Sequence, residues 1–257
     1  MKILILGAGK MGTFFCDLLS FEHEVAVFEE DPKRMRFIYN ALRLQSAEEI
    51  REFNPDLVIN CVTLIYTIEA FKTVIPYLKK NCIISDIASV KTNLQEFYNE
   101  CGMPYASTHP MFGPTFANLA NLERENTIII TEGDHLGRIF FKDLYSRLKL
   151  NIFEYTFEEH DRIVAYSLGI PFVSTLVFAG TMVHQDAPGT TFKRHINIAR
   201  GLMSEDDYLL TEILFNPRMS RQINRIQEKL TLLKSIVDHK DAVAMKEYLE
   251  EIREKIE

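Results

Sequence analysis

The sequence contains no tryptophan, and glycine and proline are scarce, with 11 and 9 copies among 257 residues. Such a composition excludes collagen-like and low-complexity chains. Only four cysteines occur and none of them forms a C-x-x-C pair, so we predict no metal site and no thioredoxin-like redox site. We identify no apolar run of membrane-spanning length and no signal-peptide cleavage site, and we therefore expect a cytoplasmic protein without a membrane partner.

Positive charge is also in short supply, because the formal net charge is −7. A nucleic-acid partner is therefore not expected, since such proteins carry basic patches or stripes. An anionic ligand would have to be held by local cationic side chains or backbone N–H groups. Hydrophobic residues make up 47% of the chain, enough for a sizeable core without disulfides.

Two patterns divide the chain. Up to about residue 156, short apolar runs typical of buried strands alternate with helical patterns, which predicts a mostly parallel sheet covered on both faces. The predicted strands are 2–6, 24–28, 56–62, 82–86, 105–108, 127–131 and 152–155. The clearest predicted helices between them are 10–20, a basic helix at 32–44, a helix between 62 and 82, and 136–148.

Strand-like runs disappear after residue 157, and long amphipathic helical patterns replace them. A long helix is predicted over 158–183, with a kink near Gly169 and Pro171. Ser204 and Asp207 resemble a capping box opening a further helix, and helices are predicted at 218–237 and 241–256. We therefore expect two domains, an α/β domain at 1–156 and an all-helical domain at 157–257.

A G-x-G-x-x-G motif follows the first predicted strand and opens a helix, which is the context that dinucleotide binding requires. Gly7 allows the tight turn, Gly9 lets the backbone approach a pyrophosphate, and Gly12 lets helix and strand pack closely. Lys10 and Met11 complete the motif at the helix N-terminus, whose N–H groups favour phosphate. The motif predicts a Rossmann-like, doubly wound domain. The alternative is a glycine turn that binds nothing, or a different nucleotide.

The end of the second strand carries Glu29, which could accept hydrogen bonds from both ribose hydroxyls and repel a 2′-phosphate. This position favours NAD over NADP. Lys33 and Arg34 follow closely and could bind a phosphate instead. Val62 and Thr63, at the end of another strand, are expected to border the cofactor.

Two polar stretches follow strands beyond the predicted switch in strand order, at 84–91 and 107–114. His109 precedes a proline that favours an extended backbone, and a histidine there could act as a general base because its pKa is near neutral. Ser89 lies in the other stretch. The alternatives are a loop histidine that only caps a turn and a serine that only caps a helix.

Together, GAGKMG (7–12), SDIASVK (85–91) and THPMFGP (108–114), followed by a helical half, resemble the prephenate/arogenate dehydrogenases of tyrosine biosynthesis. The resemblance implies NAD(P) binding, oxidation of the ring carbon that bears the hydroxyl with loss of carbon dioxide, and a homodimer formed through the helical domain. It also implies that His109 takes the hydroxyl proton while Ser89 orients hydroxyl and imidazole. Lys91 belongs to the same motif, but a solvated residue at a helix start is an equal alternative.

The sequence departs from this family in its substrate contacts. Several prephenate-specific members carry two histidines around a proline where residues 167–172 read SLGIPF, and an arginine where this chain has Asn197. We predict that Arg194, assisted by His195, supplies the missing positive charge for a small dianionic substrate, with Asn197 also in contact. For Arg200 a solvated position is favoured. A pocket of this kind could suit arogenate better than prephenate.

Two other hypotheses stay open at this point. One is a different reductase with a Rossmann-like and a helical domain, such as a hydroxyacid dehydrogenase or an imine reductase, because fold alone does not fix function. The other is a catalytically inactive NAD-binding sensor, which the missing arginine would permit.

Overall fold

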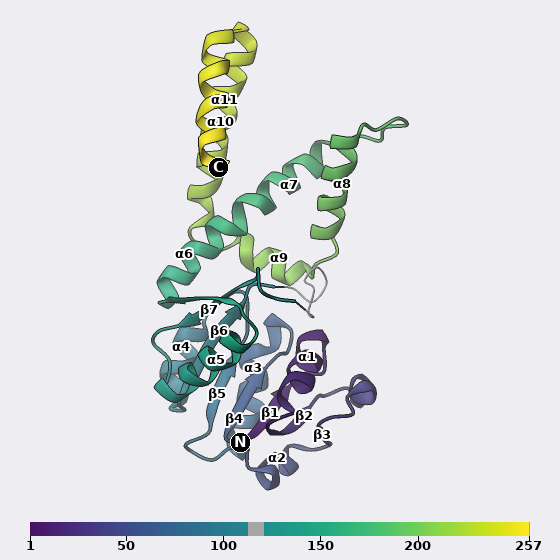
Figure 1. The fold of residues 1–257 in the computed structure, drawn as a ribbon, viewed down its shortest axis with the longest axis vertical. Helices are drawn as coiled ribbons and strands as arrows, with labels where there is room; N and C mark the ends of the chain where they lie inside the picture. Colours follow the sequence, from purple (N-terminus) through teal and green to yellow (C-terminus); the bar gives the residue numbers. More distant parts are fainter. Residues whose placement is uncertain (113–120, 257) are drawn as a thin grey trace. The chain divides into compact units, whose positions relative to one another are not determined.

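The computed structural model describes residues 1–112 and 121–256. The chain forms two compact units, Met1–Asp161 and Arg162–Glu257, and helix α6 (Phe157–Ser167) crosses the division between them. Each unit is described by itself below, and Figure 1 gives the labels of the elements.

The first unit is built on a single sheet of eight strands in the described part of the chain, ordered β3-β2-β1-β4-β5-β6-β7-β8. All neighbouring strands pair in parallel except β6 and β7, which are antiparallel. The order reverses between β1 and β4, where ligands bind in open α/β sheets. This confirms the predicted doubly wound, mostly parallel sheet. The strands are β1 (Lys2–Leu6), β2 (Glu24–Phe28), β3 (Leu42–Leu44), β4 (Leu57–Asn60), β5 (Ile83–Asp86), β6 (Tyr105–Pro110), β7 (Asn126–Ile130) and β8 (Asn151–Tyr155).

Helices connect these strands and cover both faces of the sheet. The α-helices of this unit before α6 are α1 (Lys10–Leu19), α2 (Ala47–Phe53), α3 (Thr67–Val74), α4 (Leu94–Cys101) and α5 (His135–Arg147). Three short 3₁₀ helices complete it: η1 (Pro32–Phe37), η2 (Leu64–Tyr66) and η3 (Ile75–Tyr77).

The core lies in two layers that β1 separates. Ile3 and Ile5 pack in the cluster that includes residues of α1 and α5, whereas Leu4 and Leu6 pack in the cluster that includes residues of α2, α3 and α4. Because successive strand residues point to opposite faces, a strand with helices on both sides must be apolar throughout. This requirement explains the uninterrupted apolar run at the start of the chain.

The predicted basic helix at 32–44 is wrong. Its first part is the 3₁₀ helix η1, which Asp31 caps by accepting a hydrogen bond from Lys33 N at 3.1 Å. Its last residues form β3, which pairs in parallel with β2 at the edge of the sheet. Pairing with the open edge of β2 satisfies backbone groups in both strands, and this tertiary interaction outweighs a weak helix preference.

The second unit contains helices and no strand in its described residues, as predicted. Besides the end of α6, the helices are α7 (Gly169–Thr181), α8 (Thr190–Leu202), α9 (Asp207–Leu214), α10 (Met219–His239) and α11 (Ala242–Ile256). Helix α7 packs against α8, α9 and α10, while α10 and α11 form a helical hairpin (Figure 1). A Cβ atom on Gly169 would lie 2.2 Å from Sδ of Met219, so glycine permits the close packing of α7 on α10.

Two local predictions for this unit need correction. The predicted capping box does not form, because Asp206, and not Ser204, caps α9 by accepting hydrogen bonds from the N–H groups of Tyr208 and Leu209. An aspartate directly before the first helical turn is as good a cap as serine, and it leaves the shorter helix that is observed.

The second correction concerns the length of the longest apolar helical stretch. The residues Phe157–Thr181 form a 25-residue helical stretch whose best window has a mean hydropathy of 1.8, and 22% of that window is buried. By length and composition it could cross a membrane, so the expectation that no run reaches this length is wrong. A core helix of a soluble protein also has this length and composition. The helical pattern is interrupted at Leu168, where Pro171 lacks the N–H that would bond to Ser167 O.

Candidate active site

The glycine turn between β1 and α1 has the geometry of a phosphate-binding loop. Gly7 has φ of +90°, a conformation that side chains other than glycine rarely adopt, and its N–H donates to Phe28 O at 2.9 Å. A Cβ atom on Gly12 would lie 1.9 Å from the carbonyl oxygen of Gly7, which excludes any larger residue. By contrast, a Cβ on Gly9 would meet nothing within 4 Å. Open space therefore lies over the backbone at the start of α1, where a pyrophosphate would approach.

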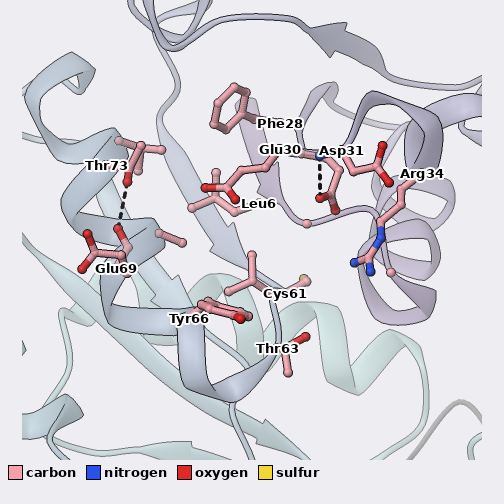
Figure 2. Close-up of a pocket in the computed structure, with 16 residues that line it drawn as sticks. Leu6, Phe28, Glu30, Asp31, Arg34, Cys61, Thr63, Tyr66, Glu69 and Thr73 are labelled. Carbon is pink, nitrogen blue, oxygen red and sulfur yellow. Dashed lines mark hydrogen bonds between the residues drawn. The ribbon is translucent and has the colours of Figure 1, made fainter.

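A cavity of about 390 Å³ extends from this turn along the carboxyl ends of the central strands (Figure 2). Glu29 lies in its wall and accepts hydrogen bonds from Ala8 N at 2.9 Å and from Asp31 N at 3.2 Å. Val62 and Thr63 also line this cavity. The cavity, the open backbone at Gly9 and the carboxylate beyond β2 together fit a dinucleotide.

Lys10 and Met11 differ from these residues, because neither lines the cavity. Lys10 is exposed at the start of α1, and Met11 is half-buried against the apolar core. Their part in cofactor binding stays a prediction.

A second cavity, of about 370 Å³, adjoins the glycine turn and is basic. It is lined by Ala8, Gly9, Lys33, Arg34, Arg36 and Phe37. Arg34 also lines the larger cavity. Arg34 therefore shares a cavity with Glu29, and an acidic and a basic side chain are both available where NAD and NADP differ.

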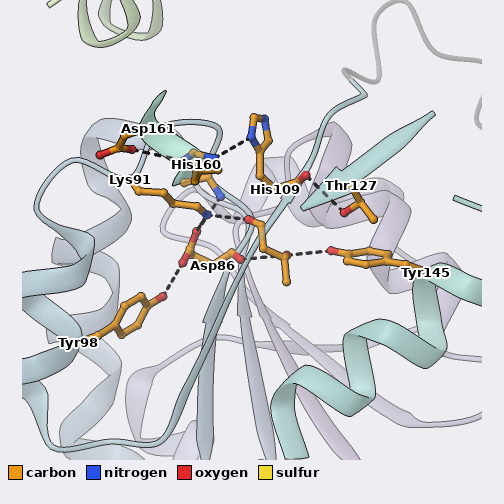
Figure 3. A network of polar contacts seen from close by, with 10 residues as sticks. Asp86, Lys91, Tyr98, His109, Thr127, Tyr145, His160 and Asp161 are labelled. Carbon is orange, nitrogen blue, oxygen red and sulfur yellow. Dashed lines mark hydrogen bonds and ion pairs between the residues drawn. The ribbon is translucent and has the colours of Figure 1, made fainter. Parts of the chain in front are cut away.

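The chemical end of the site lies where β5 and β6 finish, at the same edge of the sheet. Asp86 ends β5 and His109 is the last residue but one of β6. Lys91 follows β5 in the loop before α4, and its ammonium group pairs with the Asp86 carboxylate and donates to Thr108 O at 2.7 Å. Figure 3 shows this network. Lys91 thus ties the end of β5 to the backbone residue that precedes His109.

Both charged side chains of this pair are fully buried. The Asp86 carboxylate also accepts hydrogen bonds from Tyr98 Oη at 2.7 Å and from Ala88 N at 3.0 Å. Burial raises the pKa of Tyr98 well above its usual value, so the phenol keeps the proton that it donates. Burial lowers the pKa of Lys91, and Asp86 opposes that change. The alternative of a solvated Lys91 is therefore wrong.

His109 is 4% exposed and lies in a row of hydrogen-bonding groups. Its Nδ1 lies 3.0 Å from Nε2 of His160, and Nδ1 of His160 lies 3.3 Å from Oδ1 of Asp161 (Figure 3). Burial lowers the pKa of His109 well below its ordinary value, and His160 and Lys91 lower it further. Burial also lowers the pKa of His160. At neutral pH both imidazoles are uncharged, the state that a general base requires.

Ser89 is half-buried in the loop after β5 and does not cap a helix, because α4 begins only at Leu94 after Asn93. The helix-cap alternative is therefore wrong, and the catalytic role of Ser89 stays a prediction. The polar stretch at 107–114 ends in Gly113 and Pro114, which lie outside the described residues.

Arg194, His195 and Asn197 are all exposed on α8 in the second unit. His195 Nδ1 lies 3.0 Å from Thr191 O, and its ring centroid lies 5.3 Å from that of Phe178. Contact of these three residues with substrate stays a prediction. Among the described residues, no cluster of three His, Cys, Asp or Glu side chains could hold a metal ion.

Sequence reasoning missed His160, Asp161, Asp86 and Tyr98. Asp86 gave a usable signal, since a carboxylate that ends a buried strand must be paired. His160 gave none locally, because it lies 51 positions from His109 on an amphipathic helix start.

Comparison with known proteins shows which family this chain resembles. Residues 30–151 match the family model for the nucleotide-binding domain of prephenate dehydrogenase. The matched segment, just under half of the chain, is similar to that domain. Two of the three sequence motifs, at 85–91 and 108–114, lie within the matched residues, and the resemblance to that family is thereby confirmed.

One relative points to the same family. A "probable arogenate/prephenate dehydrogenase" of Methanocaldococcus jannaschii is 25% identical over 201 residues, which is 72% of this chain but only 44% of that protein. The match therefore spans less than half the length of this relative.

Solved structures extend the similarity in fold to both units. The prephenate dehydrogenase of A. aeolicus, solved with hydroxyphenyl propionate and NAD⁺, has a TM-score of 0.83 at 21% identity, covering 99% of this chain and 96% of that one. The arogenate dehydrogenase of Synechocystis has a TM-score of 0.79 at 17% identity, covering 99% and 98%. At these identities the likeness establishes the fold alone.

Proposed function

We propose that this protein is an NAD-dependent dehydrogenase that converts prephenate to 4-hydroxyphenylpyruvate by oxidative decarboxylation, a step of tyrosine biosynthesis. The observation that carries the proposal is the buried, uncharged His109 at the end of β6, on the same sheet edge as the glycine turn. The match of residues 30–151 to the nucleotide-binding domain of prephenate dehydrogenase supports the same reaction class.

In the proposed mechanism, His109 accepts the proton of the ring hydroxyl as the carbon that bears it is oxidised. When bound, NAD supplies the hydride acceptor, and loss of carbon dioxide makes the ring aromatic. The protein then has to align the reacting carbon, remove one proton and hold two carboxylates. Transfer to a positioned histidine accelerates such a step by about 10²–10⁴. Ser89, in the loop next to this edge, orients the hydroxyl in the proposal.

The second candidate is arogenate, which carries an ammonium group where prephenate carries a ketone. The observation that favours it is Asn197, an uncharged residue on α8 where several prephenate-specific relatives have an arginine. In the leading proposal, Arg194 and His195 on the same helix supply the positive charge for the dianionic substrate.

Absorbance of NADH at 340 nm, measured with each substrate in turn, tests the proposal. Turnover of prephenate with a higher kcat/KM than arogenate supports the leading form, and the reverse order replaces it with the arogenate form. If neither substrate yields NADH, both forms of the proposal are contradicted and an inactive NAD-binding sensor becomes the favoured hypothesis.

For the cofactor we propose NAD, with Glu29 binding the ribose hydroxyls and disfavouring a 2′-phosphate. Glu29→Ala is expected to lower kcat/KM for NAD and to narrow its advantage over NADP. Arg34→Gln is the matched control at the same cavity. A wild-type enzyme that prefers NADP, and loses that preference in Arg34→Gln, would show that the basic cavity dominates.

For assembly and location we propose a cytoplasmic homodimer that uses the helical unit and has no membrane or nucleic-acid partner. Val177 is 53% exposed on α7, a helix of largely apolar sequence, and a second copy would cover such a surface. Sedimentation at micromolar concentration is expected to give a dimer. A monomer of about 30 kDa, or co-flotation with lipid vesicles, would contradict this proposal.

A further inference from the structure

His160 is buried between two other functional groups and has no role in the mechanism described so far. Its Nε2 faces Nδ1 of His109 at 3.0 Å, and its Nδ1 faces Oδ1 of Asp161 at 3.3 Å. The His160 side chain is fully buried, whereas that of Asp161 is 40% exposed. The three side chains therefore form a row that leads from the partly exposed carboxylate to the buried imidazole of His109 (Figure 3).

Hydrogen-bonding rules fix the direction of this row. An ionised carboxylate only accepts hydrogen bonds, so the nitrogen of His160 that faces Asp161 must carry its proton. A neutral imidazole has a single N–H, and Nε2 of His160 is therefore an acceptor. Nδ1 of His109 must then donate to it, which leaves Nε2 of His109 without a proton.

We infer that His160 and Asp161 are positioning residues that set the tautomer of His109, so that its Nε2 is the free base for substrate. The inference deepens the proposed function and rests on it for the identity of the proton that is removed. A histidine of the opposite tautomer would present an N–H to the substrate hydroxyl and could not accept its proton.

Burial, together with the charged groups around the row, keeps both imidazoles uncharged. The positive charge of Lys91 lowers the pKa of both imidazoles. At His160, the negative charges of Asp161 and Asp86 oppose this effect. A proton entering either ring would put a second positive charge next to the buried ammonium. The neutral pair is therefore the resting state in which one tautomer can be selected.

Two substitutions at His160 test whether its role is to accept a hydrogen bond from His109 or only to fill space. In His160→Gln, the side-chain amide oxygen can take the place of Nε2 and still accept from His109. In His160→Asn, the shorter amide can replace only Nδ1, so the N–H of His109 loses its acceptor. We expect His160→Asn to lower kcat by about 10–100-fold, the range for a buried donor left without a partner, with the KM for NAD within about twofold. His160→Gln is expected to retain at least tenfold more kcat than His160→Asn.

His239→Asn serves as the matched control, because this histidine is exposed at the end of α10. It is expected to leave kcat unchanged. If His160→Asn does not fold, Asp161→Ala replaces it, since Asp161 is partly exposed and its loss frees His160 to adopt either tautomer.

Nitrogen-15 NMR of histidine-labelled protein reads the tautomer without any turnover. The chain has 7 histidines, and the signal lost in His109→Asn assigns the one of interest. We expect His109 to carry its proton on Nδ1 in the wild type and to show a mixture, or the Nε2–H form, in Asp161→Ala. An Nε2–H tautomer in the wild type overturns the inference, as does equal kcat in His160→Gln and His160→Asn. Failure of the proposed function can be told apart from failure of this inference. If neither substrate is turned over, the proposed function is wrong, but the NMR measurement still decides the tautomer of His109.

Discussion

Replacing Asp86 by asparagine is expected to destabilise the first unit strongly while changing almost no volume. The carboxylate is fully buried and accepts hydrogen bonds from Lys91, Tyr98 and the N–H of Ala88. Asparagine keeps one acceptor oxygen, places an NH₂ group where the other oxygen was, and removes the negative charge. Lys91 then retains its hydrogen bond to Thr108 O at 2.7 Å, but its charge is no longer balanced within the network.

The magnitude follows from burial. Breaking a buried ion pair by removing one partner costs about 3–5 kcal/mol, because the remaining charge is left uncompensated. Replacing both partners removes that penalty, so Asp86→Asn combined with Lys91→Met is expected to be less destabilised than Asp86→Asn alone.

Lys79 and Asp56 form the matched control, a pair of the same composition with N–O distance 2.5 Å and side chains 29% and 41% exposed. Lys79→Met is expected to cost under about 1 kcal/mol, because surface ion pairs contribute little. Urea unfolding followed by circular dichroism at 222 nm is the suitable assay, since the chain has no tryptophan. A cost for Asp86→Asn no larger than for Lys79→Met, or additive effects in the double variant, would refute the reasoning.

Three further predictions concern the imidazoles, the glycine turn and α8. Because burial lowers the pKa values of His109 and His160, the unfolded chain binds protons that the folded chain does not, and the free energy of unfolding is expected to fall as pH drops below about 6.5. Urea titrations at pH 7.5 and 5.5 check this, and the same fall in a variant lacking both imidazoles would contradict it. Gly9→Ala is expected to keep the melting temperature but to weaken NAD binding, because its Cβ would enter the open space over the turn. Gly12→Ala is expected to lower the melting temperature, because its Cβ would collide with the Gly7 backbone. Calorimetry measures both quantities, and unchanged NAD affinity in Gly9→Ala would place the pyrophosphate elsewhere. Arg194→Gln is expected to raise the KM for prephenate by about 10–100-fold through loss of a charge-assisted hydrogen bond, and an unchanged KM in steady-state assays would remove this residue from the pocket.

Much of the fold could be predicted because its determinants are local. The apolar run at 2–6 followed by a glycine turn specifies β1, the turn and α1 within a few residues of one another. The edge strand β3 could not be predicted in this way. Its three residues become a strand only because β2 offers unpaired backbone groups beside them, and that neighbour is not encoded in the segment itself.

In the site, too, the locally determined features were predictable and the long-range contacts were not. The roles of the glycines in the turn follow from backbone geometry that the motif implies, and their positions were predictable. The partners of His109 were not, because the His109–His160 contact joins the end of β6 to α6 across 51 positions. Lys91 was equally ambiguous, since its neighbours in sequence are compatible with a solvated loop and only Asp86 makes its burial possible.

Turnover by His109→Asn, measured with NAD affinity in the same preparation, tests the central claim most directly. The account predicts that kcat falls by about 10²–10⁴ while the Kd for NAD changes by less than about twofold, because the imidazole moves a proton and the glycine turn binds the cofactor. A kcat equal to that of the wild type would contradict the assignment of His109 as the base.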